Sequence, residues 1–169
     1  MVRWRNEPHV ARWWSTDDEP SPMTMERVIE KYGPRMDPGG ATTSCLIELA
    51  GRPVGYIQFY RWGSYAEEAR AMGMELSADA FGIDVFIGEP DLVSRGVGSR
   101  AVDLLARHLF AERGASQVAI LTALDNARAQ RAYEKAGFRK VGEVLDTDVR
   151  DGARIRSWLM TRDAPDLPS

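Results

Sequence analysis

The first regular feature of the chain is a set of apolar positions with the i, i+3, i+4, i+7 spacing of one helix face. These positions are Met25, Val28, Ile29 and Tyr32. Thr24 precedes them and can cap the helix, and glycine and proline residues at 33–40 break it. The pattern predicts an amphipathic helix over residues 25–32.

Strand-like apolar runs follow this helix. Residues 44–49 and 54–60 flank the turn Gly51-Arg52, which predicts an antiparallel hairpin. Residues 82–88 form a third apolar run, with one carboxylate, Asp84, near its start. The polar and acidic stretch between these runs, residues 62–80, is too long for a simple connection. We expect it to form a functional loop or a short-helix insert.

The second half of the chain predicts two β-α units and a closing hairpin. A helix ending at about Glu112, before Gly114, is expected to bury an apolar face of Val102, Leu104, Leu105 and Leu109. A strand at 117–122 leads to a helix at 127–136, capped by Asp125 or Asn126 and stopped at Gly137. Residues 138–145 and 153–160 read as a hairpin around Asp151-Gly152.

This order of elements predicts one α/β (α+β) domain, in which helices pack on a mixed sheet. The 169 residues leave room for one sizeable core and little space for a second module. We therefore assign residues 1–162 to a single domain and residues 163–169 to a frayed C-terminal tail.

Composition and charge narrow the class of protein. The net charge of -3 argues against nucleic acid as the main partner. No apolar run approaches the roughly 18 residues of a membrane span, and the N-terminus has no apolar signal region. We therefore expect a cytoplasmic protein with no membrane partner. One cysteine, Cys45, and two histidines make a metal site improbable on composition.

The segment Arg95-Gly96-Val97-Gly98-Ser99-Arg100 lies where a loop opens into a helix. Backbone N–H groups at a helix N-terminus lack intrahelical partners and suit a phosphate. The segment has neither the Lys-Ser/Thr ending of a P-loop nor a full G-x-G-x-x-G, which argues against nucleoside triphosphates and nicotinamide cofactors. On its own, it could also be only a tight turn.

A second motif follows the first, at the distance that one known family shows. It consists of Asn126-Ala127-Arg128-Ala129 and then Tyr133-Glu134-Lys135-Ala136-Gly137-Phe138. The pair resembles the GNAT superfamily of acyl-CoA-dependent N-acetyltransferases. In that family the glycine loop cradles the CoA pyrophosphate, and the next helix carries an Asn and a Tyr that face the pantetheine arm. The resemblance covers about residues 3 to 162 and implies a mostly antiparallel central sheet flanked by helices.

The N-terminal segment from Trp4 to Trp14 resembles the opening of one GNAT subgroup. This subgroup holds aminoglycoside 6'-N-acetyltransferases and siderophore-type lysine acetyltransferases, and Gly82-Ile83-Asp84 favours the aminoglycoside branch. Family members usually begin with a strand and a full helix before this segment, so the family's first strand is missing here. We expect either a start upstream of Met1 or a sheet edge covered by something else, such as a second subunit, and hence a monomer or a homodimer.

The resemblance implies two catalytic residues, Asp84 at the substrate amine and Tyr133 near the CoA sulfur. An alkylammonium with a pKa of about 10 must lose a proton before it attacks a thioester, and a carboxylate can hold the amine and accept or relay that proton. A tyrosine hydroxyl can protonate or stabilise the departing thiolate. Tyr133 could instead be a core residue, and Asp84 could cap a turn or pair with an arginine.

The resemblance also implies the residues that contact acetyl-CoA, including a backbone N–H of the strand at 85–87 for the oxyanion. The expected cofactor-binding set is Val85, Phe86, Ile87, Arg95, Gly96, Val97, Gly98, Ser99, Arg100, Asn126, Ala129 and Lys135. Val93 departs from the family's [Q/R]-x-x-G-x-[G/A] loop at its first position.

A polycationic aminoglycoside would be held by several carboxylates. The expected substrate-binding set is Trp13, Glu67, Glu68, Asp79 and Asp84, with Glu75 close by in the insert. Trp13 and Trp14 could equally be core residues. Thr122-Ala123 stands where the family pattern implies Asp-Pro in aminoglycoside enzymes, which removes one expected substrate carboxylate.

These observations predict a cytoplasmic, metal-independent N-acetyltransferase that uses acetyl-CoA and transfers the acetyl group directly within a ternary complex. The expected acceptor is a small-molecule amine, the 6'-amine of an aminoglycoside, which would confer antibiotic resistance. Alternatives are acetylation of a siderophore precursor, another small amine or a protein amine, and a non-catalytic acyl-CoA-binding regulatory module. Cys45 lies away from the motifs, which argues against an acetyl-cysteine route.

Overall fold

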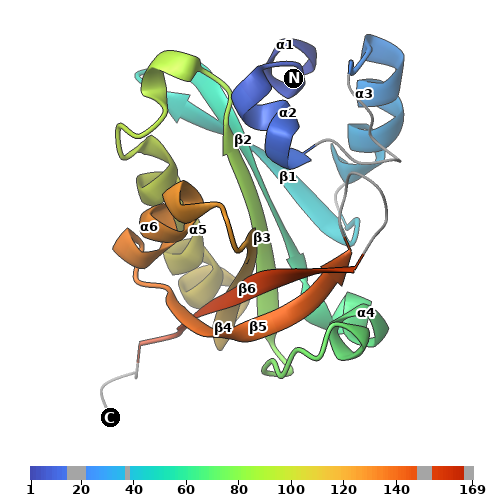
Figure 1. Cartoon of the computed structure of the whole chain (residues 1–169), viewed down its shortest axis with the longest axis vertical. Coiled ribbons are helices and arrows are strands. Elements are labelled where there is room, and N and C mark those ends of the chain that lie inside the picture. Colours follow the sequence, from blue (N-terminus) through green and yellow to red (C-terminus); the bar gives the residue numbers. More distant parts are fainter. Residues whose placement is uncertain (15–21, 37–38, 148–153, 166–169) are drawn as a thin grey trace.

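The described residues of the computed structural model, 1–14, 22–36, 39–147 and 154–165, form a six-stranded sheet covered by helices on both faces (Figure 1). The strands are β1 (Thr42–Leu49), β2 (Arg52–Arg61), β3 (Ala80–Ile87), β4 (Gln117–Ala123), β5 (Arg139–Thr147) and β6 (Arg154–Asp163). The α-helices are α1 (Val2–Arg5), α2 (Pro8–Trp14), α3 (Met25–Tyr32), α4 (Ala66–Ala71), α5 (Val97–Arg113) and α6 (Ala127–Lys135). Three short 3₁₀ helices complete the elements, η1 (Pro34–Met36), η2 (Trp62–Tyr65) and η3 (Pro90–Leu92).

The strand order is β1-β2-β3-β4-β6-β5, and every neighbouring pair is antiparallel except β3 and β4. This confirms a mixed, mostly antiparallel sheet, with the predicted hairpin β1–β2 at one edge and β5–β6 at the other. Among the described residues no strand precedes β1, which is therefore the edge strand. The predicted turn at Asp151-Gly152 lies outside the described residues.

The parallel pair β3–β4 separates after three register pairs, the last of which joins Gly82 to Ala119. Beyond that point β3 continues against β2, and β4 continues against β6. The sheet is therefore split between residues 83–87 and residues 120–123. Figure 1 shows α2 beside the upper part of β3. On the other side of the split, α6 follows directly after the end of β4.

Alternate side chains of the strands build two different layers. On one face, residues such as Ile57, Ile83 and Ile120 form the main core with α5 and α6, where Val102, Ala106 and Leu109 are fully buried. The opposite face carries two smaller apolar clusters. One packs the N-terminal helices on Tyr56 and Phe86, and the other packs η2 and α4 on Leu159.

Helix boundaries follow the predicted signals. The Thr24 hydroxyl accepts from the Arg27 N–H at the start of α3, and Asn126, rather than Asp125, caps α6 by accepting from the Ala129 N–H. Gly114 and Gly137 both adopt left-handed conformations at helix ends, with φ of 66° and 84°. β6 extends through Asp163, one residue into the range that we expected to be a tail.

Two predicted apolar faces are wrong in part. Leu104 is 54% exposed, because it lies two residues from Val102 and a helix turns about 200° over that step. In α3, Met25 and Ile29 are 58% and 63% exposed, whereas Tyr32 is buried. That short helix contacts the sheet through its C-terminal end, since Tyr32 packs edge-on against Tyr56 at 5.4 Å.

The N-terminal layer is fixed by buried polar groups. Arg5 is fully buried, donates to the Tyr32 hydroxyl and to the Trp14 carbonyl, and stacks over the Trp14 ring. The Asn6 amide exchanges two hydrogen bonds with the backbone of Met23. Glu89, only 5% exposed, accepts from Arg3 and from Trp4 Nε1 at the far end of β3. The bonds of Arg5 and Asn6 hold the N-terminal layer together. The bonds to Glu89 attach this layer to the end of β3, the strand that lines the split.

Candidate active site

A cavity of about 680 Å³ occupies the split in the sheet. Its lining includes all of residues 83–87 of β3 and 120–123 of β4. Because successive side chains of a strand point to opposite faces, a cavity lined by whole strand segments reaches both faces of the sheet. We call the part next to α5 and α6 the helix side of the cavity, and the part next to the N-terminal helices and η2 its aromatic side.

Backbone groups of β3 face the gap. The Gly88 N–H donates to Val54 on β2 over 2.8 Å, and the backbone of alternate residues points to alternate sides of a strand. The N–H and C=O groups of Ile87 and Val85 therefore point away from β2 and into the gap. In agreement, the Ile87 carbonyl lies 2.9 Å from Nε2 of His9, a residue of α2 that also lines the cavity.

The helix side begins at the N-terminus of α5. Gly96 adopts a left-handed φ of 84°, a conformation that other residues adopt only with strain, and its carbonyl accepts the first helical bond, from the Arg100 N–H. The N–H groups of residues 97–99 therefore have no partner within the helix. Gly98 and Ser99 line the cavity, as do the cations Arg128, Arg131 and Lys135 of α6.

Tyr133 of α6 is buried in the main core, yet it also lines the cavity. Its hydroxyl has no hydrogen-bond partner among the described residues. Burial, and to a lesser degree the negative charge of Asp84, raises the pKa of Tyr133 well above its usual value, so the hydroxyl keeps its proton at any physiological pH. A protonated and unpartnered hydroxyl at the split can act as a proton donor.

Asp84 lies on the opposite face of β3, where Gln58 Nε2 donates to its Oδ2 over 2.7 Å. It is half-buried and lines the aromatic side of the cavity. Its charge also contributes to the raised pKa of Tyr60, after the larger effect of burial. Since the charge acts on Tyr133 as well, Asp84 is coupled electrostatically to both sides of the split.

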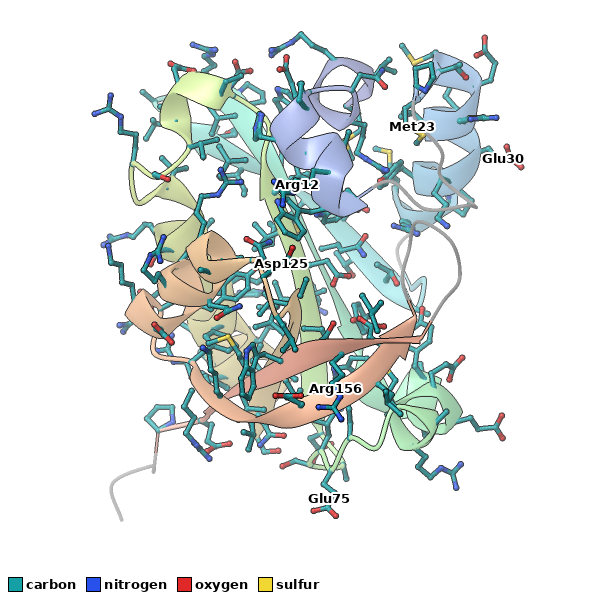
Figure 2. The ribbon with its side chains drawn as sticks, in the orientation of Figure 1. Arg12, Met23, Glu30, Glu75, Asp125 and Arg156 are labelled. Carbon is teal, nitrogen blue, oxygen red and sulfur yellow. The ribbon has the colours of Figure 1, made fainter. Side chains whose placement is uncertain are left out.

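The aromatic side is assembled from separate parts of the chain. Trp13 and Trp14 come from α2, Tyr60 and Trp62 from β2 and η2, and a second carboxylate, Asp146, from β5. Trp14 also packs on Phe86 at 4.8 Å, so it belongs to the core and to the cavity wall at once. Arg12 lines the cavity next to Trp13, and its guanidinium lies 3.9 Å from the Asp125 carboxylate. Figure 2 shows the two labelled side chains between α2 and the start of α6.

Most of the predicted site residues meet at this cavity. Those that line it are Trp13, Asp84, Val85, Phe86, Ile87, Gly96, Gly98, Ser99, Asn126, Ala129, Tyr133 and Lys135. Arg95, Val97 and Arg100 do not. The side chain of Val97 packs against the core, whereas Arg95 and Arg100 are exposed beside the loop.

The acidic residues of the insert are not brought to the cavity. Glu67 and Glu68 are exposed on α4, and Asp79 is exposed and paired with Arg61. The insert contributes apolar side chains instead, because Ala69 of α4 and Met74 are buried in the cluster around Leu159, and Trp62 and Met72 line the cavity. The Met72 carbonyl accepts from the Leu145 N–H, so the insert also holds the strand that carries Asp146.

Sequence reasoning did not assign several lining residues, among them His9, Arg35, Gln58, Tyr60 and Asp146. For Gln58 a signal existed, since a polar side chain within an otherwise apolar run of β2 is unusual for a buried strand. Asp146 gave a weaker signal as part of an acidic stretch. Its position depends on the pairing of β5 with β6, where it lies opposite Ile155.

The helix side fits acetyl-CoA in two respects. The gap in the sheet exposes strand backbone that an extended amide-containing chain can pair with, and unpartnered N–H groups with nearby cations suit phosphates. The aromatic side contains a carboxylate that suits a cationic amine.

Among the described residues, no cluster of three or more His, Cys, Asp or Glu side chains is placed to hold a metal ion. None of the described helices has the length and apolar character that a membrane crossing requires.

Comparison with known proteins gives a consistent assignment. The family model described as an acetyltransferase (GNAT) domain matches residues 1–145. The sequence is 31% identical over 152 residues to the aminoglycoside N(6')-acetyltransferase type 1 of Klebsiella pneumoniae, which covers 88% of this chain and 72% of the relative. The protein of the same name from Serratia marcescens matches to the same extent.

Solved structures of aminoglycoside acetyltransferase AAC(6')-Ib share the fold. The complex with coenzyme A and kanamycin superposes with a TM-score of 0.75 at 26% identity, covering 96% of this chain and 86% of that one. The complex with ribostamycin and coenzyme A gives a TM-score of 0.77 at 27% identity, covering 96% and 85%. The α/β fold predicted from the sequence is thereby confirmed.

Proposed function

This chain belongs to the GNAT family of acetyltransferases and is an N-acetyltransferase that uses acetyl-CoA, and we propose that its acceptor is the 6'-amine of an aminoglycoside. One observation carries the choice of acceptor: the likeness to aminoglycoside N(6')-acetyltransferases extends over 88% of the chain. The similar structures with bound coenzyme A and kanamycin or ribostamycin support it further. In a bacterium, such an activity would confer resistance to the antibiotic.

The two-sided cavity supports direct transfer. Acetyl-CoA enters from the helix side and is held by Gly98, Ser99 and Asn126, with the cations of α6 near its phosphates. It supplies an acetyl group activated as a thioester. The aminoglycoside enters from the aromatic side, where carboxylates at Asp84 and Asp146 attract its ammonium groups. The two substrates thus meet at the split, and no residue needs to carry the acetyl group in between.

Asp84 and Tyr133 handle the protons of the transfer. Asp84 holds the acceptor ammonium and accepts its proton, directly or through water, which frees the nitrogen lone pair to form the new N–C bond. As the C–S bond breaks, Tyr133 donates its hydroxyl proton to the sulfur, and that proton is replaced from the one released by the amine. A backbone N–H of β3 at Val85 or Ile87 stabilises the negative charge on the carbonyl oxygen.

The experiment is a turnover assay with acetyl-CoA, followed by release of free thiol, on kanamycin, tobramycin, a hydroxylysine siderophore precursor and a lysine peptide. We expect thiol release that depends on the aminoglycosides, and a product that carries its acetyl group on the 6'-amine. Thermal stabilisation by coenzyme A is measured in parallel. Stabilisation with turnover only on the other amines would refute the aminoglycoside acceptor, and stabilisation without any turnover would favour a binding module.

A matched pair of variants connects turnover to the site. Asp84→Asn removes the carboxylate from the cavity, whereas Glu30→Gln makes the same chemical change on the outer face of α3, where Figure 2 shows Glu30 pointing into solvent. We expect only the first variant to lose aminoglycoside-dependent thiol release. Equal rates for the two variants would contradict the role of Asp84.

A further inference from the structure

The Asp84 carboxylate is held by a buried amide. Gln58 lies opposite Asp84 in the register of β2 and β3, is 8% exposed, and donates from Nε2 to Asp84 Oδ2 over 2.7 Å. An amide side chain can present either its NH₂ group or its oxygen to a neighbour. Which group Gln58 presents to the Asp84 carboxylate therefore depends on the groups around the other end of the amide.

Two donors fix that other end. Arg35 Nη1 and the Tyr56 hydroxyl each donate to Gln58 Oε1 over 2.8 Å. A guanidinium group can only donate, and an amide oxygen has two lone pairs, so Oε1 is fully used. The Tyr56 oxygen can in turn accept from the Ser44 hydroxyl at 2.7 Å. The chain of bonds therefore has one direction, and the NH₂ group of Gln58 is turned toward Asp84.

We infer that Gln58 is a positioning residue for Asp84, and that Arg35 acts on acetyl transfer through Gln58. The inference rests on the proposed role of Asp84 at the acceptor amine. A donated N–H stabilises the ionised form of a carboxylate and fixes its orientation. The ionised form is the one that can hold an ammonium group and accept its proton.

Among the described residues, other titratable groups that interact with Asp84 or with its neighbours come from β2, α6 and β5. On β2 they include Tyr56, whose pKa is raised by burial first and by Asp84 last. Tyr60 of β2 and Tyr133 of α6 both have a pKa raised by burial first and by Asp84 second, so both stay neutral. Asp146 of β5 acts on Tyr60 as well. Arg35 thus brings a full positive charge to the network, one side chain away from Asp84.

Arg35 also connects this network to the N-terminal layer. It belongs to η1 and stacks over the Tyr32 ring at 5.1 Å. The hydroxyl of Tyr32 accepts from the buried Arg5, which holds the end of α2 through the Trp14 carbonyl. The helix that supplies the aromatic wall and the carboxylate that meets the amine are therefore joined by one continuous set of contacts.

The test is the titration of the Asp84 carboxyl group, followed by NMR in protein labelled with ¹³C at the aspartate side-chain carboxyl and assigned with Asp84→Asn. In Gln58→Leu we expect Asp84 to titrate about one pH unit higher than in the wild-type protein. Arg35→Met should shift it in the same direction, by less. In the Gln58→Leu background, Arg35→Met should add no further shift.

An unchanged titration in both single variants would overturn the inference, and so would shifts that add in the double variant, because Arg35 would then act on Asp84 directly. If Gln58→Leu fails to fold, the shift in Arg35→Met alone decides. Glu30→Gln is the control and should leave the titration unchanged. This readout needs no acceptor, so a shifted titration in an enzyme that does not acetylate aminoglycosides would refute the proposed function and leave the positioning role intact.

Kinetics on an acceptor that is turned over give a second readout. Gln58→Leu should lower kcat about tenfold, as expected for the loss of a hydrogen bond to a charged group, and leave the KM for acetyl-CoA unchanged. A change confined to the KM for acetyl-CoA would contradict a role at Asp84, because it would indicate distortion of the helix side instead.

Discussion

The two sides of the cavity are built in different ways. The helix side is lined by two short segments, residues 92–99 and 126–135, and offers backbone N–H groups, small residues and cations. The aromatic side takes its lining from α2, η1, β2, η2, β3 and the β5–β6 hairpin, and offers rings and the two carboxylates of Asp84 and Asp146. Binding on the first side therefore depends on local backbone conformation, whereas function on the second depends on how distant elements pack together.

This difference separates the expected effects of substitutions. A change on the helix side should act on acetyl-CoA affinity, because the groups there are held by the chain immediately around them. A change on the aromatic side should act on the rate of transfer or on acceptor affinity.

The largest effect is expected from Asp84→Asn. An amide keeps the shape of the side chain but cannot accept the proton of the acceptor ammonium, so kcat should fall by about a hundredfold or more. Thermal stabilisation by acetyl-CoA should stay within error of the wild-type value. A variant that loses acetyl-CoA binding together with turnover would show that the two sides are not separate.

The next effect is expected at the start of α5. A side-chain carbon on Gly98 would contact only Ile87, at an ordinary 3.6 Å, so Gly98→Ala should be tolerated. Gly98→Asp adds a carboxylate where phosphates would bind, and should weaken acetyl-CoA binding by about tenfold or more through like-charge repulsion. Isothermal titration of both variants measures this. Equal affinities for the two would mean that the phosphates bind elsewhere.

Glu89 follows β3 and connects the end of that strand to the N-terminal layer, because it accepts from Arg3 and Trp4. Hydrogen bonds from Arg3 and then Trp4 lower its pKa from 4.5 to about 2. The ionised group therefore adds stability that is fully present above pH 4.5 and is lost as the pH falls toward 2. In Glu89→Gln, urea unfolding from pH 5 to about 2.5 should show a flatter loss of stability than in the wild-type protein. Parallel pH curves would contradict this role.

The smallest effect is expected in the acidic insert. Glu67→Gln combined with Glu68→Gln removes two exposed charges that do not line the cavity, so the KM for the acceptor should change by less than about twofold at physiological salt. The measurement is the acceptor KM at two ionic strengths. A large rise in KM would mean that the insert closes over the acceptor when it binds.

The same difference explains what could be predicted from the sequence. The caps at Thr24 and Asn126 and the glycine turn into α5 depend on neighbours within a few residues, so local patterns could predict them. The role of Tyr133 was expected only from the resemblance to the GNAT family. The partnership of Gln58 with Arg35 joins residues 23 positions apart, and Asp146 faces the cavity only because β5 pairs with β6. Such contacts depend on packing and have no local signature.

The charge of the insert did not predict which carboxylates line the cavity, because the packing of the insert decides where its side chains point. The carboxylates of Glu67 and Glu68 point to solvent from α4, whereas Ala69 of the same helix is buried. Asp79 lies after α4, where it is exposed and paired with Arg61. Leu104 gives the apolar counterpart, because its residue type favours burial and its position on α5 prevents it. The sequence therefore showed where the acidic residues are, but not that their side chains point away from the cavity.

The most direct test of the two-sided cavity is the initial rate of acetyl transfer measured over a grid of acetyl-CoA and kanamycin concentrations. Direct transfer requires both substrates to be bound at once, which predicts intersecting lines in the double-reciprocal plots. Parallel lines would contradict the account, because they would mean that an acetylated enzyme forms and coenzyme A departs before the acceptor reacts.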